Sequence, residues 1–502
     1  MSAAEKLGDR AARGIAWVTG QSVFSRLIGY FAQLALAWFL TREDFGLFGM
    51  ALTISEFSRV FNQGGVSKVL IHRHKGFNKW ATPGLWLSLT MGILVSASMV
   101  FLGYFACGWF QVDEPKKLFQ LVCLLAVTAP ISAIGTIPRA LLLIKLKFRE
   151  IALVGSLLLV VGSLVKVGLA YAGYGAFSLV IPMVLTTALQ TLFFWFLARP
   201  SIKPKLMMRR WRYLFSDSAS IIATSFWYKI ITHGDYAILA AFASQTELGL
   251  YFFAFNYAVQ AVMVFTQGIT SIAFPALAKL NDEPKRQLQA FRRGAAILSA
   301  VVFPASVAQC FLFKPVVEEF FPSIWLPAIP MLQLLSLGMA GRTLSWISAS
   351  LMEAQGRFHE RMWLGLFSAI AFIAIAMAGV FLGKHFGIGA PMGMAVAVAL
   401  YYPLMSLATI WVALKQSADR FQIIREICFA PACLSLVAFG PIYAVALAVT
   451  DYHYLQIAII SIVGSLIYIL VGRVWMESIW SDLIGRVTRV IPVHYLPRKN
   501  RL

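Results

Sequence analysis

The stretch that decides the fold is residues 13–40, RGIAWVTGQSVFSRLIGYFAQLALAWFL, which is apolar apart from a few small polar side chains. A run of this length is sufficient for a membrane helix, which needs about 20 predominantly apolar residues. Arg26 stands near its middle, where a guanidinium costs about 3 kcal/mol or more. Such a cation normally faces a water-filled cavity or a partner. The stretch therefore predicts both a membrane helix and a functional residue.

The rest of the 502-residue chain repeats this pattern, with 59% hydrophobic and only 13% charged residues. Successive apolar runs of this length indicate a polytopic helical membrane protein rather than a β-barrel. The net charge of +21 would suggest nucleic acid in a soluble protein. Here the basic residues cluster in short loops between apolar runs, as membrane orientation produces, so we expect no nucleic-acid partner.

Neither a cofactor nor a metal is expected. The five cysteines form no CxxC pair, and no histidine cluster accompanies them. No Walker A loop and no paired carboxylates in an outer loop are present, which argues against an enzyme and leaves no catalytic residues to name. Residues 1–12 are polar and lack a cleavable apolar core, so we expect no removed signal peptide.

The predicted fold is an all-α polytopic membrane protein with about 14 transmembrane helices. The spans are 13–40, 45–71, 81–108, 118–142, 151–172, 175–198, 213–241, 248–274, 294–317, 327–350, 361–383, 387–413, 427–449 and 454–474. With a cytoplasmic N-terminus, about 31 of the 43 lysines and arginines fall inside, so both termini are predicted to be cytoplasmic.

An internal repeat links the two halves of the chain. LTREDFGLFGMA (40–51) resembles ASQTELGLYFFA (243–254), and a shift of 203 residues carries Gly46 onto Gly249 and Arg26 onto Lys229. A chance match of short motifs is the alternative. The repeat predicts two pseudo-symmetric six-helix lobes around a central cavity, as in transporters built of parallel repeats.

The predicted organisation has six parts. They are a cytoplasmic segment 1–12, an N-lobe 13–198, a basic linker 199–212, a C-lobe 213–413, two further spans in 427–474, and a C-terminal part, 475–502. The last part mixes apolar and charged residues, which favours an amphipathic helix on the cytoplasmic surface followed by a basic tail. A frayed polar tail is the alternative.

Three further cations are predicted at similar depth, namely Arg59, Lys229 and Arg342. Glu56 precedes Arg59 by one helical turn and can pair with it, so a structural role stays open for this arginine. No acid of the same helix reaches Arg26, Lys229 or Arg342. Because uncompensated charge in a membrane is costly, we expect the cations to line one cavity holding an anion such as pyrophosphate.

Polar side chains recur at helical spacing beside these cations and are expected to line the same cavity. They are Ser22, Gln33, Glu56, Gln63, Ser225, Asn256 and Gln260. By contrast, Lys68, Arg139 and Lys166 lie close enough to span ends to snorkel to water, so they are assigned no site. His233 and Asp235 are candidates for coupling to Na⁺ or H⁺, or are ordinary polar groups at the end of their span.

Seven stretches carry a family resemblance by their order and spacing over about residues 10–415. They are LTREDFGLFGMA (40–51), NQGGVSKVLI (62–71), LKFRE (146–150), GDYAIL (234–239), LGLYFFAFNYA (248–258), FPALAKL (274–280) and EAQGR (353–357). Together they resemble the polysaccharide-transporter (Wzx-type) branch of the multidrug/oligosaccharidyl-lipid/polysaccharide flippase superfamily.

The resemblance implies a bacterial inner-membrane flippase that moves undecaprenyl-pyrophosphate-linked oligosaccharide by alternating access. The glycan would belong to O-antigen, lipopolysaccharide or exopolysaccharide synthesis, with membrane lipids, a polymerase and glycosyltransferases as partners. In relatives a cationic cavity holds the pyrophosphate, and Arg26, Arg59, Lys229 and Arg342 match that role by depth. The alternatives are a multidrug/cation antiporter, which would use Glu56 or Asp235, and a membrane polysaccharide polymerase.

Overall fold

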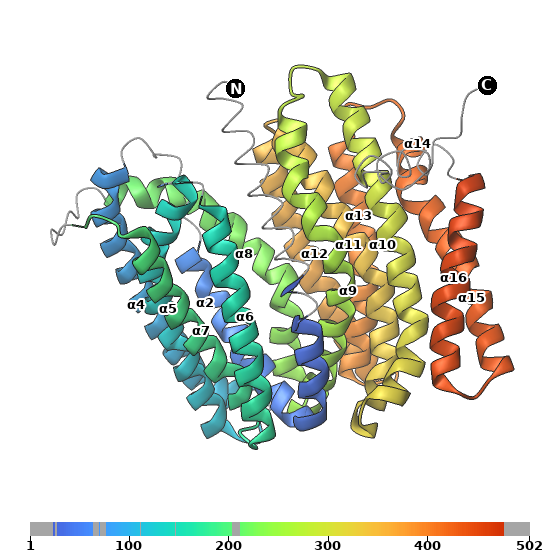
Figure 1. Ribbon diagram of the computed structural model, residues 1–502, viewed down its shortest axis with the longest axis horizontal. Helices are drawn as coiled ribbons and strands as arrows, with labels where there is room; N and C mark the ends of the chain where they lie inside the picture. The colour runs from blue at the N-terminus through green and yellow to red at the C-terminus, as the bar shows by residue number, and fades with distance from the viewer. Residues whose placement is uncertain are drawn as a thin grey trace, which may run out of the picture. The chain divides into compact units, whose positions relative to one another are not determined.

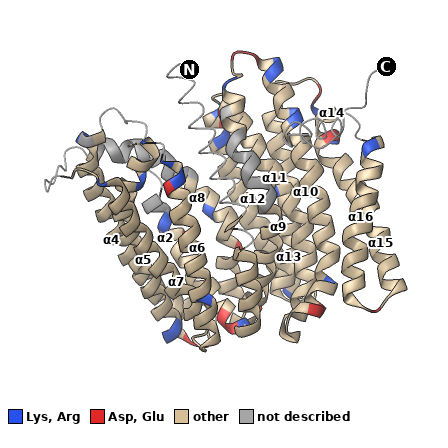
Figure 2. Cartoon of the chain, in the orientation of Figure 1, with Lys and Arg blue, Asp and Glu red and all other residues tan. Residues whose placement is uncertain are grey.

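A computed structural model describes residues 24–25, 28–63, 70, 77–110, 112–145, 147–202 and 211–475. All regular secondary structure among these residues is helical, as the apolar runs predict (Figure 1). Ten of the described helices are long and apolar enough to cross a membrane. Lysines, arginines and acids gather mostly near helix ends in the part drawn in colour (Figure 2), so the helix middles there carry few charged residues.

After the helix Ile28–Phe39, the elements follow one another with short connections. They are α2 (Arg42–Gln63), α4 (Phe77–Trp109), α5 (Pro115–Ile144), α6 (Phe148–Tyr171), α7 (Phe177–Ala198), α8 (Trp211–Phe242), α9 (Gln245–Ala278), α10 (Pro284–Phe320), η3 (Ser323–Ala328), α11 (Ile329–Ala354), α12 (Phe358–His385), α13 (Ala390–Ala413), α14 (Arg420–Ile424), η4 (Arg425–Phe429), α15 (Ala430–Val449) and α16 (His453–Trp475).

Most predicted spans agree with these helices, and α10 shows the clearest difference. The predicted span begins at residue 294, whereas the helix begins at Pro284. The additional turns carry several charged residues, and side-chain pairing stabilises them together with the burial of Phe291. Arg292 pairs with Glu426, its Nε donating to Oε2 at 2.7 Å and its Nη2 to Oε1 at 2.5 Å.

Contacts divide the described residues into two compact units. Unit 1 takes the residues up to Gln260, with Phe320–Leu335 and His359–Tyr401, and unit 2 takes Ala261–Glu319, Ser336–Phe358 and the residues from Tyr402 on. The predicted lobe boundaries do not coincide with these bounds and remain a prediction. The predicted surface helix at 475–491 lies, apart from its first residue, outside the described residues.

The starts of α2 and α9 carry the same capping pattern, which the repeat predicts. In α2 the Thr41 hydroxyl accepts from the Asp44 backbone N–H at 3.2 Å, and the Asp44 carboxylate accepts from the Thr41 backbone N–H at 3.2 Å. In α9 Ser244 and Glu247 exchange the same two hydrogen bonds, at 3.2 and 2.9 Å. Each pair is a capping box that satisfies the first free amides of its helix.

These two helix starts pack directly against each other within unit 1. A Cβ built on Gly46 would collide with the carbonyl oxygen of Gln245, and one built on Gly249 would collide with that of Arg42. The repeat shift of 203 residues carries Arg42 onto Gln245 and Gly46 onto Gly249, so the two contacts are reciprocal. Only glycine permits this approach of the backbones.

Two loops with matching sequences fold over the capping carboxylates. Gly175 adopts φ +52°, and the backbone N–H of Ala176 donates to Asp44 Oδ1 at 2.9 Å. In the second half Gly389 adopts φ +86°, and a Cβ built on it would lie 3.9 Å from Glu247 Oε1. The Thr246 hydroxyl also donates to Glu43 Oε1 at 2.8 Å, so the connections at 43–44, 175–176 and 246–247 belong to one cluster.

Unit 2 has its own core, which joins α10 to the last two helices. Phe439 and Ala446 of α15 and Ile460 of α16 pack with Ala300 of α10. The Tyr468 hydroxyl donates to the Ala300 carbonyl oxygen at 3.0 Å, which satisfies this buried hydroxyl. The two spans that the sequence places after the C-lobe therefore pack on α10.

Candidate functional site

A charged cluster forms where α2 meets α8 in unit 1. Glu56 of α2 accepts a hydrogen bond from the Lys229 ammonium of α8 and lies 3.4 Å from Arg59 Nη1. Its Oε2 is also 3.9 Å from His233 Nε2. The side chains of Glu56, Arg59 and Lys229 are only 13–18% exposed, so water screens the three charges weakly.

The Glu56 cluster, as we call these four side chains, corrects one inference from the sequence. The pairing of Arg59 with Glu56 is confirmed. Among the described side chains of α8 no acid pairs with Lys229, but Glu56 of α2 does, so the lysine does not depend on an external anion for its stability. Its partner comes from a helix 173 residues away in the sequence.

The cluster keeps an excess of positive charge. One carboxylate faces a lysine and an arginine, so the formal charge of the group is about +1 when histidine is counted as neutral. The second contact of Arg59 is with a neutral group, since its Nη2 donates to the Thr128 hydroxyl of α5 at 2.8 Å. An anion could therefore join the cluster by competing with Glu56 for Lys229 or Arg59.

Arg342 belongs to unit 2 and has a different environment. Its guanidinium carbon lies 5.6 Å from the Trp346 ring centre and 5.3 Å from that of Tyr402, and the side chain is buried. Gly341 allows α11 to approach the backbone of Pro403 in α13. The faces of both aromatic rings attract a cation, which stabilises Arg342 in its buried position.

The structure describes only some of the remaining predicted site residues. Arg26 and Ser22 lie outside the described residues, and the side chain of Gln63 at the end of α2 does as well. Ser225 is partly buried on α8, one turn before Lys229. The equal depth of Arg26 and Lys229 in the repeat stays a prediction.

His233 and Asp235, which the sequence groups as one ion site, face different partners. His233 points to the Glu56 cluster. Asp235 is 1% exposed, and its Oδ2 accepts a hydrogen bond from the Tyr251 hydroxyl of α9 at 2.8 Å. Asp235 therefore joins α8 to α9, while His233 is the residue of the two that could alter the charge of the cluster.

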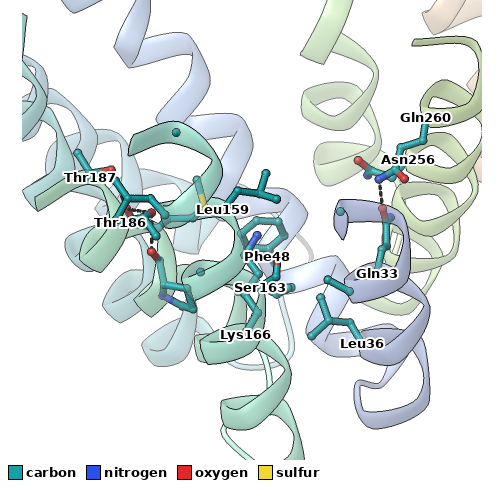
Figure 3. A pocket seen from close by; sticks show the side chains of 18 of the residues that line it. Gln33, Leu36, Phe48, Leu159, Ser163, Lys166, Thr186, Thr187, Asn256 and Gln260 are labelled. Carbon is teal, nitrogen blue, oxygen red and sulfur yellow. Dashed lines mark hydrogen bonds between the residues drawn. The ribbon is translucent and has the colours of Figure 1, made fainter. Parts of the chain in front are cut away.

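A cavity of about 490 Å³ opens between the helix Ile28–Phe39, α2, α6, α7 and α9, all within unit 1 (Figure 3). Three predicted polar residues line it: Gln33, Asn256 and Gln260. The Gln260 amide donates to Gln33, and Asn256 Nδ2 donates to the Phe252 carbonyl oxygen at 2.8 Å. The lining also includes Lys166, to which the sequence assigned no site.

Comparison with known proteins gives the chain a family and a fold. The profile of a family described as "Polysaccharide biosynthesis protein" matches residues 35–330. An uncharacterised membrane protein in the cps region of Klebsiella pneumoniae is 24% identical over 364 residues, 72% of this chain and 74% of its own. Lipopolysaccharide biosynthesis protein WzxC of Escherichia coli K12 is 23% identical over 389 residues, 75% and 77% of the two chains.

The fold is that of a solved transporter. The structure of lipid II flippase MurJ in an inward closed conformation has a TM-score of 0.73 to this chain. It is 16% identical, and the match covers 92% of this chain and 98% of that one. At this identity the likeness establishes the fold alone, and it confirms the predicted all-α transporter architecture.

Proposed function

This chain belongs to the polysaccharide biosynthesis protein family and is a multi-pass membrane transporter, and on that premise we propose that it flips a lipid-linked oligosaccharide. The substrate is an undecaprenyl-pyrophosphate-linked repeat unit, moved across the bacterial inner membrane by alternating access. Such a headgroup cannot cross hydrocarbon unaided, because each unpaired charge or polar group costs several kcal/mol there. The chain's cytoplasmic termini follow from its positively charged loops.

The observation that carries the proposal is the Glu56 cluster, in which one carboxylate serves two cations. Glu56 is the carboxylate partner of both Lys229 and Arg59 while no substrate is bound. A pyrophosphate carries several acceptor oxygens and more negative charge than a carboxylate, so it can replace Glu56 as their partner. Arg26 is expected to join them from the first span.

The exchange of Glu56 for the headgroup as the partner of the cations can also run backwards, which returns the transporter to its substrate-free state. When the headgroup leaves, Glu56 can pair again with Lys229, so the lysine regains a carboxylate partner within the membrane. His233, 3.9 Å from Glu56, offers a site where a proton could bias that exchange. Coupling to H⁺ is therefore favoured over Na⁺ in this proposal.

The antiporter alternative gains less support. An antiporter for cationic drugs needs acids that are available to the substrate. Both predicted acids are engaged in unit 1, Glu56 by Lys229 and Arg59 and Asp235 by the Tyr251 hydroxyl. A cationic substrate would have to displace resident cations from Glu56.

Deletion of the gene, followed by mass spectrometry of lipid extracts, tests the proposal. We expect undecaprenyl-pyrophosphate-linked repeat units to accumulate and surface polysaccharide to disappear. Complementation with the Arg26→Ala variant is expected to fail, although the variant inserts into the membrane. If the deleted strain exports polysaccharide normally and accumulates no lipid-linked intermediate, the proposal is wrong.

A further inference from the structure

Among the described residues that line the cavity of about 490 Å³ in unit 1, Lys166 of α6 is the one charged side chain. This described lining contains no carboxylate, and it does not include Glu56, Arg59 or Lys229. Figure 3 shows Lys166 and Ser163 on α6, with Gln33, Asn256 and Gln260 on other helices around the same space. The cavity is thus distinct from the Glu56 cluster in its residues and in its charge balance.

Lys166 makes no ion pair and no hydrogen bond with the described part of the chain, in contrast to Lys229. Two neighbours in the lining, Ser163 of α6 and Gln190 of α7, are likewise without a side-chain hydrogen bond among the described residues. Polar groups that line a cavity in a membrane helix bundle without bonding each other remain available to a ligand. A bound anion would compensate the lysine.

The other polar groups of the lining offer acceptors. The Thr186 hydroxyl donates to the Pro182 carbonyl oxygen, and the Thr187 hydroxyl donates to that of Met183, both at 2.7 Å. Each hydroxyl oxygen keeps a free lone pair, which can accept from a ligand hydroxyl. The described lining also contains aliphatic side chains and the aromatic rings of Phe45, Phe48 and Phe252. Hydroxyls, amides and apolar faces in one cavity suit a molecule rich in hydroxyl groups.

We propose that this cavity binds an acidic sugar of the transported glycan, with its carboxylate on the Lys166 ammonium and its hydroxyls on the amides and threonine hydroxyls. The inference rests on the proposed function, since it assigns the sugar part of the same substrate. A single lysine balances one carboxylate, whereas a pyrophosphate carries more charge than one lysine can compensate. The cavity volume falls within the range of about 300–1,000 Å³ usual for small-molecule sites.

The test is a binding comparison on the full-length purified protein in detergent, with D-glucuronate, D-glucose and inorganic pyrophosphate as probes. We expect the wild type to bind glucuronate more tightly than glucose. The Lys166→Gln variant is expected to weaken glucuronate binding about tenfold, the loss of one charge-assisted hydrogen bond, and to leave glucose binding unchanged. Lys166→Arg is expected to restore the preference for glucuronate.

Lys117→Gln is the matched control, because Lys117 is an exposed lysine of unit 1 that pairs with Glu114 at 2.7 Å. It is expected to bind all three probes like the wild type. Pyrophosphate separates this inference from the proposed function: its binding should depend on Lys229 and not on Lys166. Failure of pyrophosphate binding in every variant would reject the headgroup site alone.

Three results would overturn the inference. They are equal binding of glucuronate and glucose by the wild type, unchanged glucuronate binding by Lys166→Gln, and a loss of pyrophosphate binding in Lys166→Gln with glucuronate binding retained. The last would mean that the cavity takes a phosphate group. If Lys166→Gln does not fold, the wild-type preference and the Lys166→Arg variant still decide the question.

Discussion

Two lysines of unit 1, Lys229 of α8 and Lys166 of α6, differ in whether a carboxylate lies beside them. Lys229 meets the carboxylate of Glu56, which Arg59 shares. Lys166 lines a cavity together with hydroxyls and amides, and no acid is among the described lining residues. A paired lysine contributes to stability and must exchange partners to bind a ligand. A lysine without a carboxylate costs stability and gains its partner only when a ligand arrives.

The largest effect is expected from Lys229→Ala, which removes the cation that both Glu56 and the headgroup use. Surface polysaccharide export should be abolished, because the remaining cluster has one carboxylate and one arginine and no excess charge to attract pyrophosphate. Export is measured by complementation of a deleted strain, with membrane insertion checked by immunoblot. Lys117→Ala, at an exposed pair, should export normally. Normal export by Lys229→Ala would remove the Glu56 cluster from the mechanism.

The next effect is expected from Glu56→Gln, which leaves two partly buried cations without a carboxylate. Breaking a buried ion pair by removing one partner costs about 3–5 kcal/mol, so the melting temperature of the purified protein should fall markedly. Glu114→Gln is the control, since its exposed pair is worth about 1 kcal/mol or less.

A double variant sharpens this prediction. Glu56→Gln combined with Lys229→Met should recover part of the lost stability, because the stranded charge is gone, but not export. A double variant that is no more stable than Glu56→Gln alone would show that the two residues do not depend on each other.

A smaller effect is expected from Thr128→Val, which removes the hydroxyl that accepts from Arg59 Nη2 at 2.8 Å. The free energy of unfolding should fall by about 1.5 kcal/mol, the value of a hydrogen bond to a charged group. Thr136→Val, on an exposed part of the same helix, is the matched control. Equal melting temperatures of the two variants would mean that Arg59 does not need this acceptor.

The smallest effect, of opposite sign, is expected from Lys166→Met. With no ligand present, removal of a lysine that has no carboxylate should leave the melting temperature unchanged or raise it slightly. The measurement is thermal unfolding beside Glu56→Gln under the same conditions. If Lys166→Met and Glu56→Gln lower the melting temperature equally, the presence or absence of a carboxylate partner does not explain how the two lysines differ.

Much of the fold was predictable because membrane helices are continuous apolar runs. The first turns of α10 were missed since they are charged, although Pro284 after Asp282 and Glu283 is a helix-start signal. The repeat was predictable from two short motifs. The sequence pattern of the Thr41–Asp44 and Ser244–Glu247 capping boxes was a second sign of it, because it marks matching helix starts in both halves.

The candidate site was less predictable, since tertiary pairing decides it. Glu56 and Arg59 are neighbours on one helix, so their pair was predictable. Nothing in the local sequence links Glu56 to Lys229, because which faces of α2 and α8 meet depends on packing. From the sequence, Lys166 was assigned no site solely because it lies close to the end of its span. Its neighbours Gly162 and Ser163 on the same helix face were the available signal that a cavity lies there.

The reciprocal contact of Gly46 with Gln245 and of Gly249 with Arg42 bears on the origin of the chain. In a two-fold symmetric dimer, residue i of one copy contacts residue j of the other, and j contacts i. The helix starts of α2 and α9 follow the same rule, since the shift of 203 residues turns one contact into the other. A half-length ancestor could therefore have formed the same contact with a second copy of itself, and gene fusion would have preserved it.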